Sequence, residues 1–506
     1  MPTKLLAPIY LCIASFLLTT LCINAQPGTI DSTFAVNGLA RYDFFGTNFC
    51  EMTEILPDGK ILQGGSRESN WLLFVRYLPN GTIDSTFGEG GSISPYLQGV
   101  SLIPKVHLQT DGKLLVGDIS NFKDKLLFAR YDQNGKIDST FGVNGVISYP
   151  FVARSNSDIY YPYRITTDLG GRIFLTGMSI NDKMAVLCLQ PNGKIDYTFA
   201  NNGYRYFDVD TLKSSGQSLT PLPDGKMIFS GFTNVPGGGD LVLVKLTANG
   251  QNDSTFGTNG MVTVPIGTGT PIGTRIKTDT SGNIYVSGHL KIDSTVVLAL
   301  IKFDSTGLLD QNYGSGGIAT AYITGDDHGG MFDFQSDGKV VVGGQSGNYG
   351  NGNSTLIMVR FTTDGQLDST FGTNGITHME VGQSVGIRPQ LKILKNGQII
   401  YGNWARFNSA HFILMRFNND ISLGIQQGEQ REQVLLIYPN PAQEIIKIDH
   451  STMAKWYSIQ TLDGRAIQYG NFLEDIHIDH LVKGMYMVYL LGEKRELIGG
   501  GRFIKD

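Results

Sequence analysis

Short apolar runs separated by tight turns fill most of the chain between residues 26 and 420. In each unit an Asp-Gly, Asn-Gly or related turn leads into a nearly continuous run of Val, Ile and Leu. Such turns between apolar runs indicate β-hairpins, because their residues tolerate positive φ. A continuous apolar run is typical of a strand buried on both faces. The seven hairpin segments are Pro57–Gly65, Thr110–Asp118, Asp168–Gly177, Pro223–Gly231, Thr280–Gly288, Ser336–Gly344 and Lys395–Asn403.

A third strand that ends in an aromatic or apolar residue follows most hairpins. It is clearest at Leu72–Tyr77, Leu126–Tyr131, Val242–Leu246, Leu298–Phe303 and Leu356–Phe361. A further turn and a fourth strand, such as Gly145–Phe151, complete each unit. Four antiparallel strands per unit is the number found in the blade of a β-propeller.

Between the third and fourth strands stands one repeated phrase, IDSTFG followed by NG. It occurs at Gly28–Gly38, Gly81–Gly91, Gly135–Gly145, Gly193–Gly203, Gly250–Gly260, Gly307–Gly317 and Gly365–Gly375. Its aromatic residues, from Phe34 to Phe371, follow one another at intervals of 53 to 58 residues. A period of that size with strand-like residues between the copies predicts one propeller blade per repeat.

The order of the segments predicts how the ring closes. The repeats open with a phrase and a fourth strand, Asp31–Phe44, that no hairpin precedes. They end with a hairpin and a third strand, Ile393–Phe417, that no phrase follows. We therefore expect an all-β fold over residues 26–420, a seven-bladed β-propeller whose N-terminal strand completes the last blade. Closure removes the sheet edges that promote aggregation.

A basic residue stands eight positions before the phrase aspartate in five units. The pairs are Arg76/Asp84, Arg130/Asp138, Lys245/Asp253, Lys302/Asp310 and Arg360/Asp368. In the third unit Cys188 precedes Asp196, and Arg416 has only Asp31, at the other end of the repeats, as a partner. We expect each basic group to meet a phrase aspartate, within its hairpin or in a neighbouring blade. The alternative is that both side chains only solvate the ends of turns.

The first 25 residues have the pattern of a secretory signal peptide. Lys4 precedes the apolar run Leu5–Cys22, and the small residue Ala25 stands before Gln26. No later run is long enough to cross a membrane as a helix. Removal of the signal leaves Cys50 and Cys188 in different blades, so we expect no disulfide. The net charge of −5 and the absence of basic runs disfavour a nucleic-acid partner.

The repeat pattern stops after Phe417. Residues 421–433 are polar and are interpreted as a linker. Residues 434–506 contain short strands and turns, which predict a separate small β-sandwich.

These motifs carry two family resemblances. The seven phrases and their hairpins resemble the delta-60 repeat, a β-propeller repeat of bacterial surface and secreted proteins that brings no particular activity with it. The tail resembles the type A C-terminal sorting domain of the type IX secretion system. Its matching residues are Tyr438, Pro439, Asn440, Pro441, the turn Leu462–Arg465, Gly484, Tyr486 and Lys505. This second resemblance implies a Bacteroidota-type Gram-negative cell, passage of the outer membrane by that machinery, and removal of the tail on arrival.

Candidate chemistry is weak. Gly382–Gly386 matches the G-x-S-x-G pattern, but no helical periodicity follows it, as a nucleophile elbow requires. His477 and His480 lack further zinc ligands. The phrase aspartates supply too few oxygens for calcium, so we interpret the Asp and Ser of the phrase as turn caps and its Phe as a packing plug. We expect no catalytic residue, no metal and no cofactor.

The loops between the second and third strands should emerge on one face, the loop face. They vary in length and sequence, as binding loops on a rigid scaffold do, and Tyr349 and Trp404 lie near them as stacking candidates. We expect a secreted or cell-surface protein that binds glycan or protein on this face without catalysis. Two alternatives remain: a polysaccharide-acting hydrolase or lyase, and a purely structural adhesion component.

Overall fold

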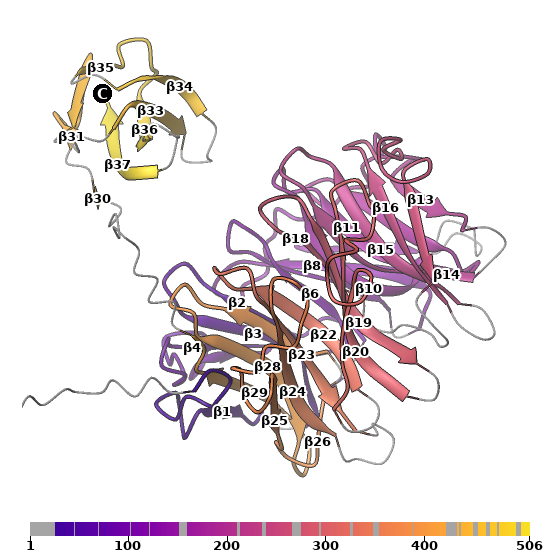
Figure 1. Ribbon diagram of the computed structural model, residues 1–506. Helices are drawn as coiled ribbons and strands as arrows, with labels where there is room; N and C mark the ends of the chain where they lie inside the picture. Colours follow the sequence, from indigo (N-terminus) through magenta and orange to yellow (C-terminus); the bar gives the residue numbers. More distant parts are fainter. Residues whose placement is uncertain are drawn as a thin grey trace, which may run out of the picture. The chain divides into compact units, whose positions relative to one another are not determined.

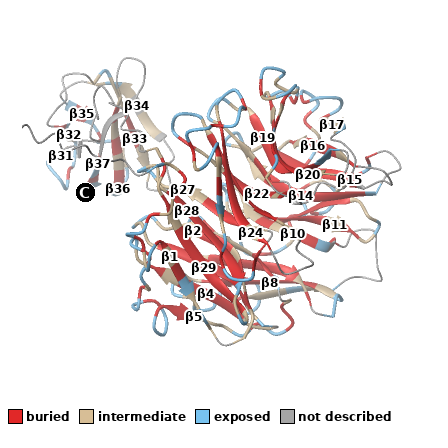
Figure 2. Ribbon diagram, turned by 60° about the horizontal axis from the view of Figure 1, so that its bottom comes forward, coloured by how far each residue is buried: buried red, intermediate tan, exposed pale blue. Residues whose placement is uncertain are grey.

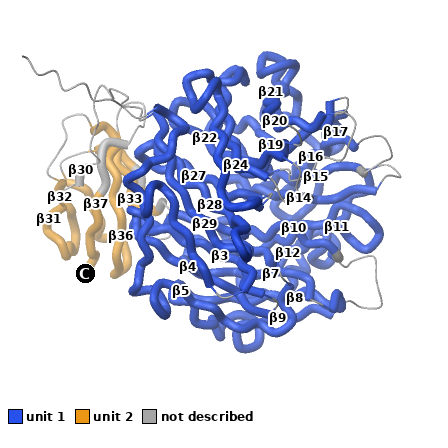
Figure 3. Tube along the Cα trace, turned by 90° about the horizontal axis from the view of Figure 1, so that it is seen from below, with its two compact units in different colours: residues 1–421 blue, residues 422–506 orange. Residues whose placement is uncertain are grey.

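The computed structural model describes residues 26–44, 46–68, 70–101, 103–120, 122–150, 159–209, 213–234, 239–265, 275–292, 295–323, 327–347, 354–386, 388–420, 433–434, 437–448, 454–461, 466–472, 475–491 and 497–506. The predicted signal peptide, most of the predicted linker, the turn Leu462–Arg465 and Tyr349 lie outside these residues. The chain divides into two compact units, residues 1–421 and 422–506 (Figure 3).

Every element of the described chain is a β-strand (Figure 1). Six sheets of the first unit hold four strands each, in chain order. The first two sheets contain β2 (Asn48–Ile55), β3 (Ile61–Arg67), β4 (Leu72–Tyr77) and β5 (Ser92–Ile93), and β6 (Lys105–Leu108), β7 (Leu114–Ile119), β8 (Lys125–Tyr131) and β9 (Val146–Pro150). The next two contain β10 (Ile159–Thr167), β11 (Ile173–Ser179), β12 (Met184–Leu189) and β13 (Tyr204–Phe207), and β14 (Lys213–Pro221), β15 (Met227–Asn234), β16 (Asp240–Leu246) and β17 (Met261–Pro265). The last two contain β18 (Arg275–Thr278), β19 (Ile284–Ile292), β20 (Thr295–Phe303) and β21 (Ile318–Ala321), and β22 (Asp327–Phe334), β23 (Val340–Ser346), β24 (Thr355–Phe361) and β25 (Ile376–Met379).

The remaining sheet of this unit joins the two ends of the repeats. It contains β26 (Ser384–Val385), β27 (Gln390–Ile393), β28 (Ile399–Arg406), β29 (Ala410–Phe417) and β1 (Leu39–Tyr42). Strand β1 pairs antiparallel with β29 and places Leu39 opposite Met415. The first strands of the sheets contact one another in cyclic order, and β27 contacts β2. We call these first strands, β2, β6, β10, β14, β18, β22 and β27, the inner strands, and the space that they surround the channel.

The second and third strands of each sheet form the core. All residues of β3 except Arg67 are buried, as are all of β12, and Figure 2 shows mostly buried strands in the interior of this unit. The sequence of β12 is continuously apolar, whereas β3 also buries Gln63 and Ser66. The hydrophobic clusters join neighbouring sheets: one contains Leu62 and Phe74 from one sheet and Val116 and Leu127 from the next. Packing between sheets therefore holds the repeats together, as in other repeat folds.

The hairpin turns differ in detail from the prediction that both residues of the Asp-Gly pair use positive φ. At Leu56–Lys60 only Gly59 has positive φ, of 81°, while Asp58 Oδ1 accepts a hydrogen bond of 3.1 Å from the Lys60 amide. The Asn-Gly turn of the phrase does have two such residues, because Asn37 and Gly38 have φ of 52° and 89°. The aspartate side chain therefore caps the first kind of turn, while Asn and Gly together form the second.

The second unit is a small two-sheet domain. One sheet contains β30 (Gln433–Val434), β37 (Leu497–Lys505), β36 (Gly484–Leu491), β33 (Trp456–Thr461) and β34 (Ala466–Asn471). The other contains β31 (Ile437–Tyr438), β32 (Ile445–Ile448) and β35 (Asp475–His477). A core that includes Ile446, Ile459, Val488 and Phe503 lies in this unit.

Candidate functional site

The phrase aspartate is the centre of a polar cluster in each repeat. In the second copy, Asp84 Oδ2 lies 2.7 Å from Arg76 Nε and 3.1 Å from Lys60 Nζ. Its other oxygen, Oδ1, accepts hydrogen bonds from the amide and hydroxyl of Thr86, at 3.1 and 2.6 Å. The turn is thus capped through aspartate and threonine, whereas the phrase serine, such as Ser85, is exposed. The interpretation of the phrase serine as a turn cap beside the aspartate was therefore wrong, because threonine makes these bonds.

The strand cation meets the aspartate in most copies. The nitrogen–oxygen distances are 2.8 Å for Arg130–Asp138, 2.9 Å for Lys302–Asp310, 2.8 Å for Arg360–Asp368 and 2.7 Å for Arg416–Asp31. The hairpin residue Lys113 or Lys339 adds a second cation, at 3.2 and 3.1 Å, and at Asp31 the amide of Gln398 takes this place, at 2.8 Å. The sequence analysis missed the hairpin residue, although Lys recurs there after Asp-Gly.

Two copies depart from the predicted pairing. Lys245 makes no ion pair with Asp253 among the described residues; Lys226 of the hairpin does so instead, at 2.8 Å. Both lysines are available in this copy and the hairpin lysine occupies the carboxylate, so the prediction for Lys245 was wrong. Where the hairpin residue is Asn283, by contrast, the strand lysine Lys302 makes the pair.

In the third copy an arginine of the hairpin turn, Arg172, makes one of the contacts that a strand arginine makes elsewhere. Cys188 is buried, with Sγ 3.9 Å from Asp196 Oδ2. Arg172, at the hairpin position, donates to the carbonyl of Ala248 in the next repeat, at 2.6 Å. The strand arginines Arg130 and Arg416 make the equivalent bond to Pro191 and Pro79 of their next repeats. Arg172 therefore makes the bond to the next repeat that a strand arginine makes in other copies. Its carboxylate partner is Asp168 rather than Asp196.

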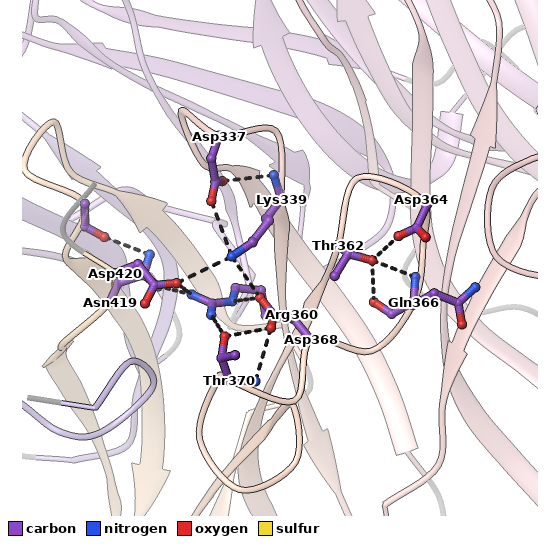
Figure 4. Close-up of polar contacts among 11 residues, drawn as sticks. Asp337, Lys339, Arg360, Thr362, Asp364, Gln366, Asp368, Thr370, Asn419 and Asp420 are labelled. Atoms are coloured by element: carbon purple, nitrogen blue, oxygen red, sulfur yellow. Dashed lines mark hydrogen bonds and ion pairs between the residues drawn. The ribbon is translucent and has the colours of Figure 1, made fainter. Parts of the chain in front are cut away.

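The most buried of these clusters surrounds Arg360, whose side chain has no exposed area (Figure 4). Its guanidinium lies 2.8 Å from Asp368 and 2.6 Å from Asp420, and it donates to Asn419 and Thr370 at 2.8 Å each. Burial raises the pKa of Asp368, but hydrogen bonds from Thr370 and Lys339 outweigh it and bring that pKa to about 2. The carboxylate is therefore charged at neutral pH and the cluster is a structural joint.

The phrase aromatics pack between repeats, as predicted. Phe141 is fully buried, and a Cβ added to Gly193 of the next repeat would lie 2.6 Å from its ring. The Arg130 guanidinium lies 4.6 Å from the centre of the same ring. The residue after the aromatic also bonds the next repeat through the backbone: the amide of Gly142 donates to Asn192 O at 3.1 Å. In the last copy, Gly372 donates to Pro27 O at 2.7 Å, which links the two ends of the repeats.

The sorting-motif residues hold the last strand of the small domain. The Asn440 side chain donates to Arg502 O at 3.1 Å and accepts from the Ile504 amide at 2.9 Å. Tyr486 is buried, stacks on Phe503 with ring centres 5.6 Å apart, and donates to Val482 O at 2.8 Å. Gly484 pairs with Lys505, Tyr438 is half exposed, and Pro439 and Pro441 both follow cis peptide bonds.

Several sequence candidates carry no chemistry in the described structure. Ser384 of the G-x-S-x-G segment lies in strand β26 rather than at a strand-to-helix elbow. Trp404 is buried and packs edge-on against Phe49, so it was wrong as an exposed stacking residue. Cys50 and Cys188 are free thiols. No group of three or more metal-ligating side chains occurs among the described residues.

An aromatic groove lies between the outer strands β1 and β5, and Arg67, where a loop between second and third strands begins, reaches it. Tyr42, Phe44, Arg67, Glu89, Ser92, Ser94 and Pro95 are among its lining residues. The rings of Tyr42 and Phe44 stack 6.3 Å apart, and the Arg67 guanidinium lies 4.4 Å from the centre of the Phe44 ring. Tyr42 Oη also bonds Ser92 Oγ at 2.7 Å, which joins the two sheets at the base of the groove.

Two layers of mostly polar residues, which were not predicted from the sequence, lie along the channel. β-Bulges interrupt β2, β10, β14 and β22, and such bulges redirect side chains. The first layer, at equivalent positions beside the bulges, holds Met52, Lys105, Arg164, Ser218, Arg275, Met331 and Gln390. The second layer, two residues further along each strand, holds Glu54, His107, Thr166, Thr220, Lys277, Asp333 and Lys392.

Lysines neutralise the carboxylates of the channel. Lys392 Nζ lies 2.6 Å from Glu54, Lys277 Nζ lies 2.7 Å from Asp333, and Lys105 Nζ lies 3.9 Å from Glu51. Burial raises the pKa of Asp118, behind Lys105, to about 6, and burial lowers the pKa of His107 to about 4. His107 is therefore neutral at pH 7.

The fold and the tail together define a β-propeller protein with a C-terminal export domain, and comparison with known families gives the same result. A model described as a β-propeller domain of unknown function (DUF5122) matches residues 56–87, 222–256 and 335–371. A model described as a secretion system C-terminal sorting domain matches residues 436–499. The chain thus contains a β-propeller domain of the first family and a sorting domain of the second, which makes it an exported protein that engages secretion machinery. No curated protein matches the chain.

Solved structures resemble the chain distantly. The extracellular domain of a hybrid two-component system from B. thetaiotaomicron is 10% identical, with a TM-score of 0.37, covering 92% of this chain but only 58% of that domain. A polysaccharide lyase described as a PL25 ulvan lyase is 10% identical, with a TM-score of 0.46, over 75% of this chain and 96% of that one. Drosophila semaphorin 2a is 8% identical, with a TM-score of 0.44, over 96% and 99%. The described part of our chain holds no helix with the length and hydrophobicity that a membrane crossing needs.

Proposed function

We propose that this protein is a non-catalytic binding propeller, delivered to the cell surface or medium by the type IX secretion system, that binds a glycan in the aromatic groove between β1 and β5. The groove is the observation that carries this proposal. Aromatic side chains supply large rigid contact surfaces, and a few polar groups among them fix a ligand's orientation. Tyr42 and Phe44 provide the flat surface, while Arg67, Glu89 and Ser94 provide the polar groups.

Pairing of the channel carboxylates favours binding over hydrolysis. A glycosidase needs two carboxyl groups at a set separation, one of them free to exchange a proton. Glu51, Glu54 and Asp333 each lie within 4.0 Å of a lysine, so each already has a charged partner in the channel. The hydrolase or lyase alternative predicts turnover of any glycan that binds, and the structural alternative predicts no small ligand.

The test is calorimetric titration of the full-length protein with a panel of neutral and acidic oligosaccharides. The variants are Tyr42→Ala and Phe44→Ala, and the matched control is Phe122→Ala, an aromatic residue that is 84% exposed and lies outside the groove. We expect a hit whose affinity falls at least tenfold in both groove variants and is unchanged in the control. Unchanged affinity in the groove variants would show that the glycan binds outside the groove. A panel without any bound oligosaccharide would favour the structural role. Reducing-end release during the titration would favour the enzyme.

A further inference from the structure

The channel holds more positive than negative groups, although the whole chain carries a net charge of −5. Its two layers and their neighbours contain six cations: Lys105, Arg164, Arg275, Lys277, Arg388 and Lys392. The carboxylates Glu51, Glu54 and Asp333 are each paired with a lysine, and the carboxylate of Asp118 also interacts with Lys105. The charges of Glu54 and Glu51 also favour the charged form of Arg164, but the six cations outnumber these four carboxylates.

Arg164, Arg275 and Arg388 have no carboxylate oxygen within 4.0 Å among the residues that the structure describes. Arg275 is only 8% exposed, and its Nε contacts Met331 Sδ at 3.0 Å. Arg164, from the other side of the channel, reaches the same sulfur at 4.0 Å. A thioether is a weak acceptor that leaves most of a guanidinium's five donors unused.

The positive charges of Arg164 and Arg388 also disfavour the charged form of Arg275. Burial lowers the pKa of Arg275, and the charges of Arg164 and Arg388 lower it further, while the charge of Glu51 acts more weakly in the opposite direction. A buried charge without a partner is costly, and two like charges in a low-dielectric site add to that cost. A ligand of opposite charge would remove this cost, which makes the arrangement a candidate binding site.

We propose that Arg164 and Arg275, with Arg388 nearby, form an oxyanion-binding site in the channel that takes the carboxylate or sulfate group of an acidic oligosaccharide. The planar guanidinium matches the geometry of both oxyanions with two parallel hydrogen bonds. The cleft at this point is also lined by Tyr163, His107 and Gln390, which supply polar contacts to a sugar. Met331 is unbranched and flexible, so an anion can displace its sulfur from the two arginines.

The geometry selects one charged group rather than a long polyanion. Side chains from β10, β18 and β22 meet at Met331, so the space beside the two guanidinium groups is narrow and suits a single small oxyanion group. The paired carboxylates on the channel wall would repel a continuous row of negative charges. This site is separate from the aromatic groove, and its existence does not depend on the glycan proposed there.

The test measures binding by the full-length protein of a tetragalacturonate, a sulfated tetrasaccharide, a neutral cellotetraose and inorganic sulfate. The variants are Arg275→Gln and the double change Arg164→Gln with Arg275→Gln. Arg406→Gln is the matched control, since Arg406 is an exposed arginine at the end of β28, outside the channel cleft. Groove variants are measured in parallel, so that loss at one site is distinguished from loss at the other.

We expect one of the acidic tetrasaccharides to bind at least a hundredfold more tightly than cellotetraose, with at least a tenfold loss in the double variant and none in the control. Arg275→Lys keeps the positive charge but not the planar guanidinium with its two parallel donors. It should therefore show an intermediate loss of affinity. Midpoints of thermal unfolding at or above that of the wild type verify that the variants fold. Equal affinity of wild type and double variant, or equal binding of neutral and acidic chains, overturns the proposal. Binding of inorganic sulfate without either acidic chain overturns the glycan assignment.

Discussion

Arg416 Nε lies 2.7 Å from Asp31 Oδ2, although 385 residues separate the two in the chain. Together with the pairing of β1 and β29, this contact ties the first repeat to the last. Both side chains are largely buried, at 14% and 7% exposure. Removal of one partner therefore strands a charge at the junction.

The junction pair is expected to contribute measurably to stability. Asp31→Ala should lower the free energy of unfolding by about 3 kcal/mol, because Arg416 is left without its carboxylate and Thr33 without its cap. The measurement is urea denaturation of the full-length protein. The control is Asp58→Ala, at an exposed hairpin pair of 3.5 Å, which should cost under about 1 kcal/mol. Equal losses in the two variants would show that the Asp31 pair adds nothing beyond a turn cap.

Arg360 and Arg275 should respond in opposite directions to the same substitution. Arg360→Met leaves Lys339 as the remaining cation for Asp368 and Asp420 and should destabilise the protein by about 3 kcal/mol. Arg275→Met removes a buried cation that has no carboxylate within 4.0 Å among the described residues, and it should leave the unfolding midpoint unchanged or raise it. Thermal unfolding without ligand measures both. A large loss at Arg275 would mean that the arginine has a structural partner.

Acid should weaken the propeller through the phrase aspartates. The hydrogen bond from Lys226 lowers the pKa of Asp253 to about 2, and the pKa of Asp368 is also about 2. The unfolded value is near 4, so the folded state binds these protons less tightly than the unfolded state. The stabilisation is present above pH 4 and is lost as the pH falls toward 2, by up to about 1.4 kcal/mol per pH unit for each group. Asp253→Asn should make this slope shallower; an unchanged slope would exclude Asp253 from the transition.

The repeat phrase was informative because one sequence has to satisfy the same local geometry in every copy. Its aspartate, threonine, aromatic residue and glycines each have a fixed neighbour, so spacing alone indicated the strands, the turns and the pairing of Arg416 with Asp31. The prediction for Lys245 was wrong because two lysines compete for the carboxylate of Asp253. Only the three-dimensional structure shows that Lys226 makes the ion pair.

The channel was not predictable in the same way. Arg164, Arg275 and Lys105 occupy equivalent positions on three inner strands. No repeated sequence motif marks these positions, and the strands differ in sequence. Bulges shift the register of several inner strands by a residue, so counting from the hairpin does not place their side chains. The groove likewise combines Tyr42 with Ser94 from different sheets.

The degenerate sixth copy of the phrase offers a substitution that should stabilise the protein. Tyr313 replaces the usual phenylalanine, is 1% exposed, and its hydroxyl has no hydrogen-bond partner among the described residues. A buried hydroxyl without a partner costs about 1–3 kcal/mol. Tyr313→Phe should therefore raise the free energy of unfolding by about 1 kcal/mol, as urea denaturation would measure. Tyr77→Phe is the matched control, because the Tyr77 hydroxyl donates to Gln63 Oε1 at 3.0 Å and its removal should destabilise the protein by about 1 kcal/mol. A loss of similar size in both variants would mean that Tyr313 has found a partner, such as a buried water.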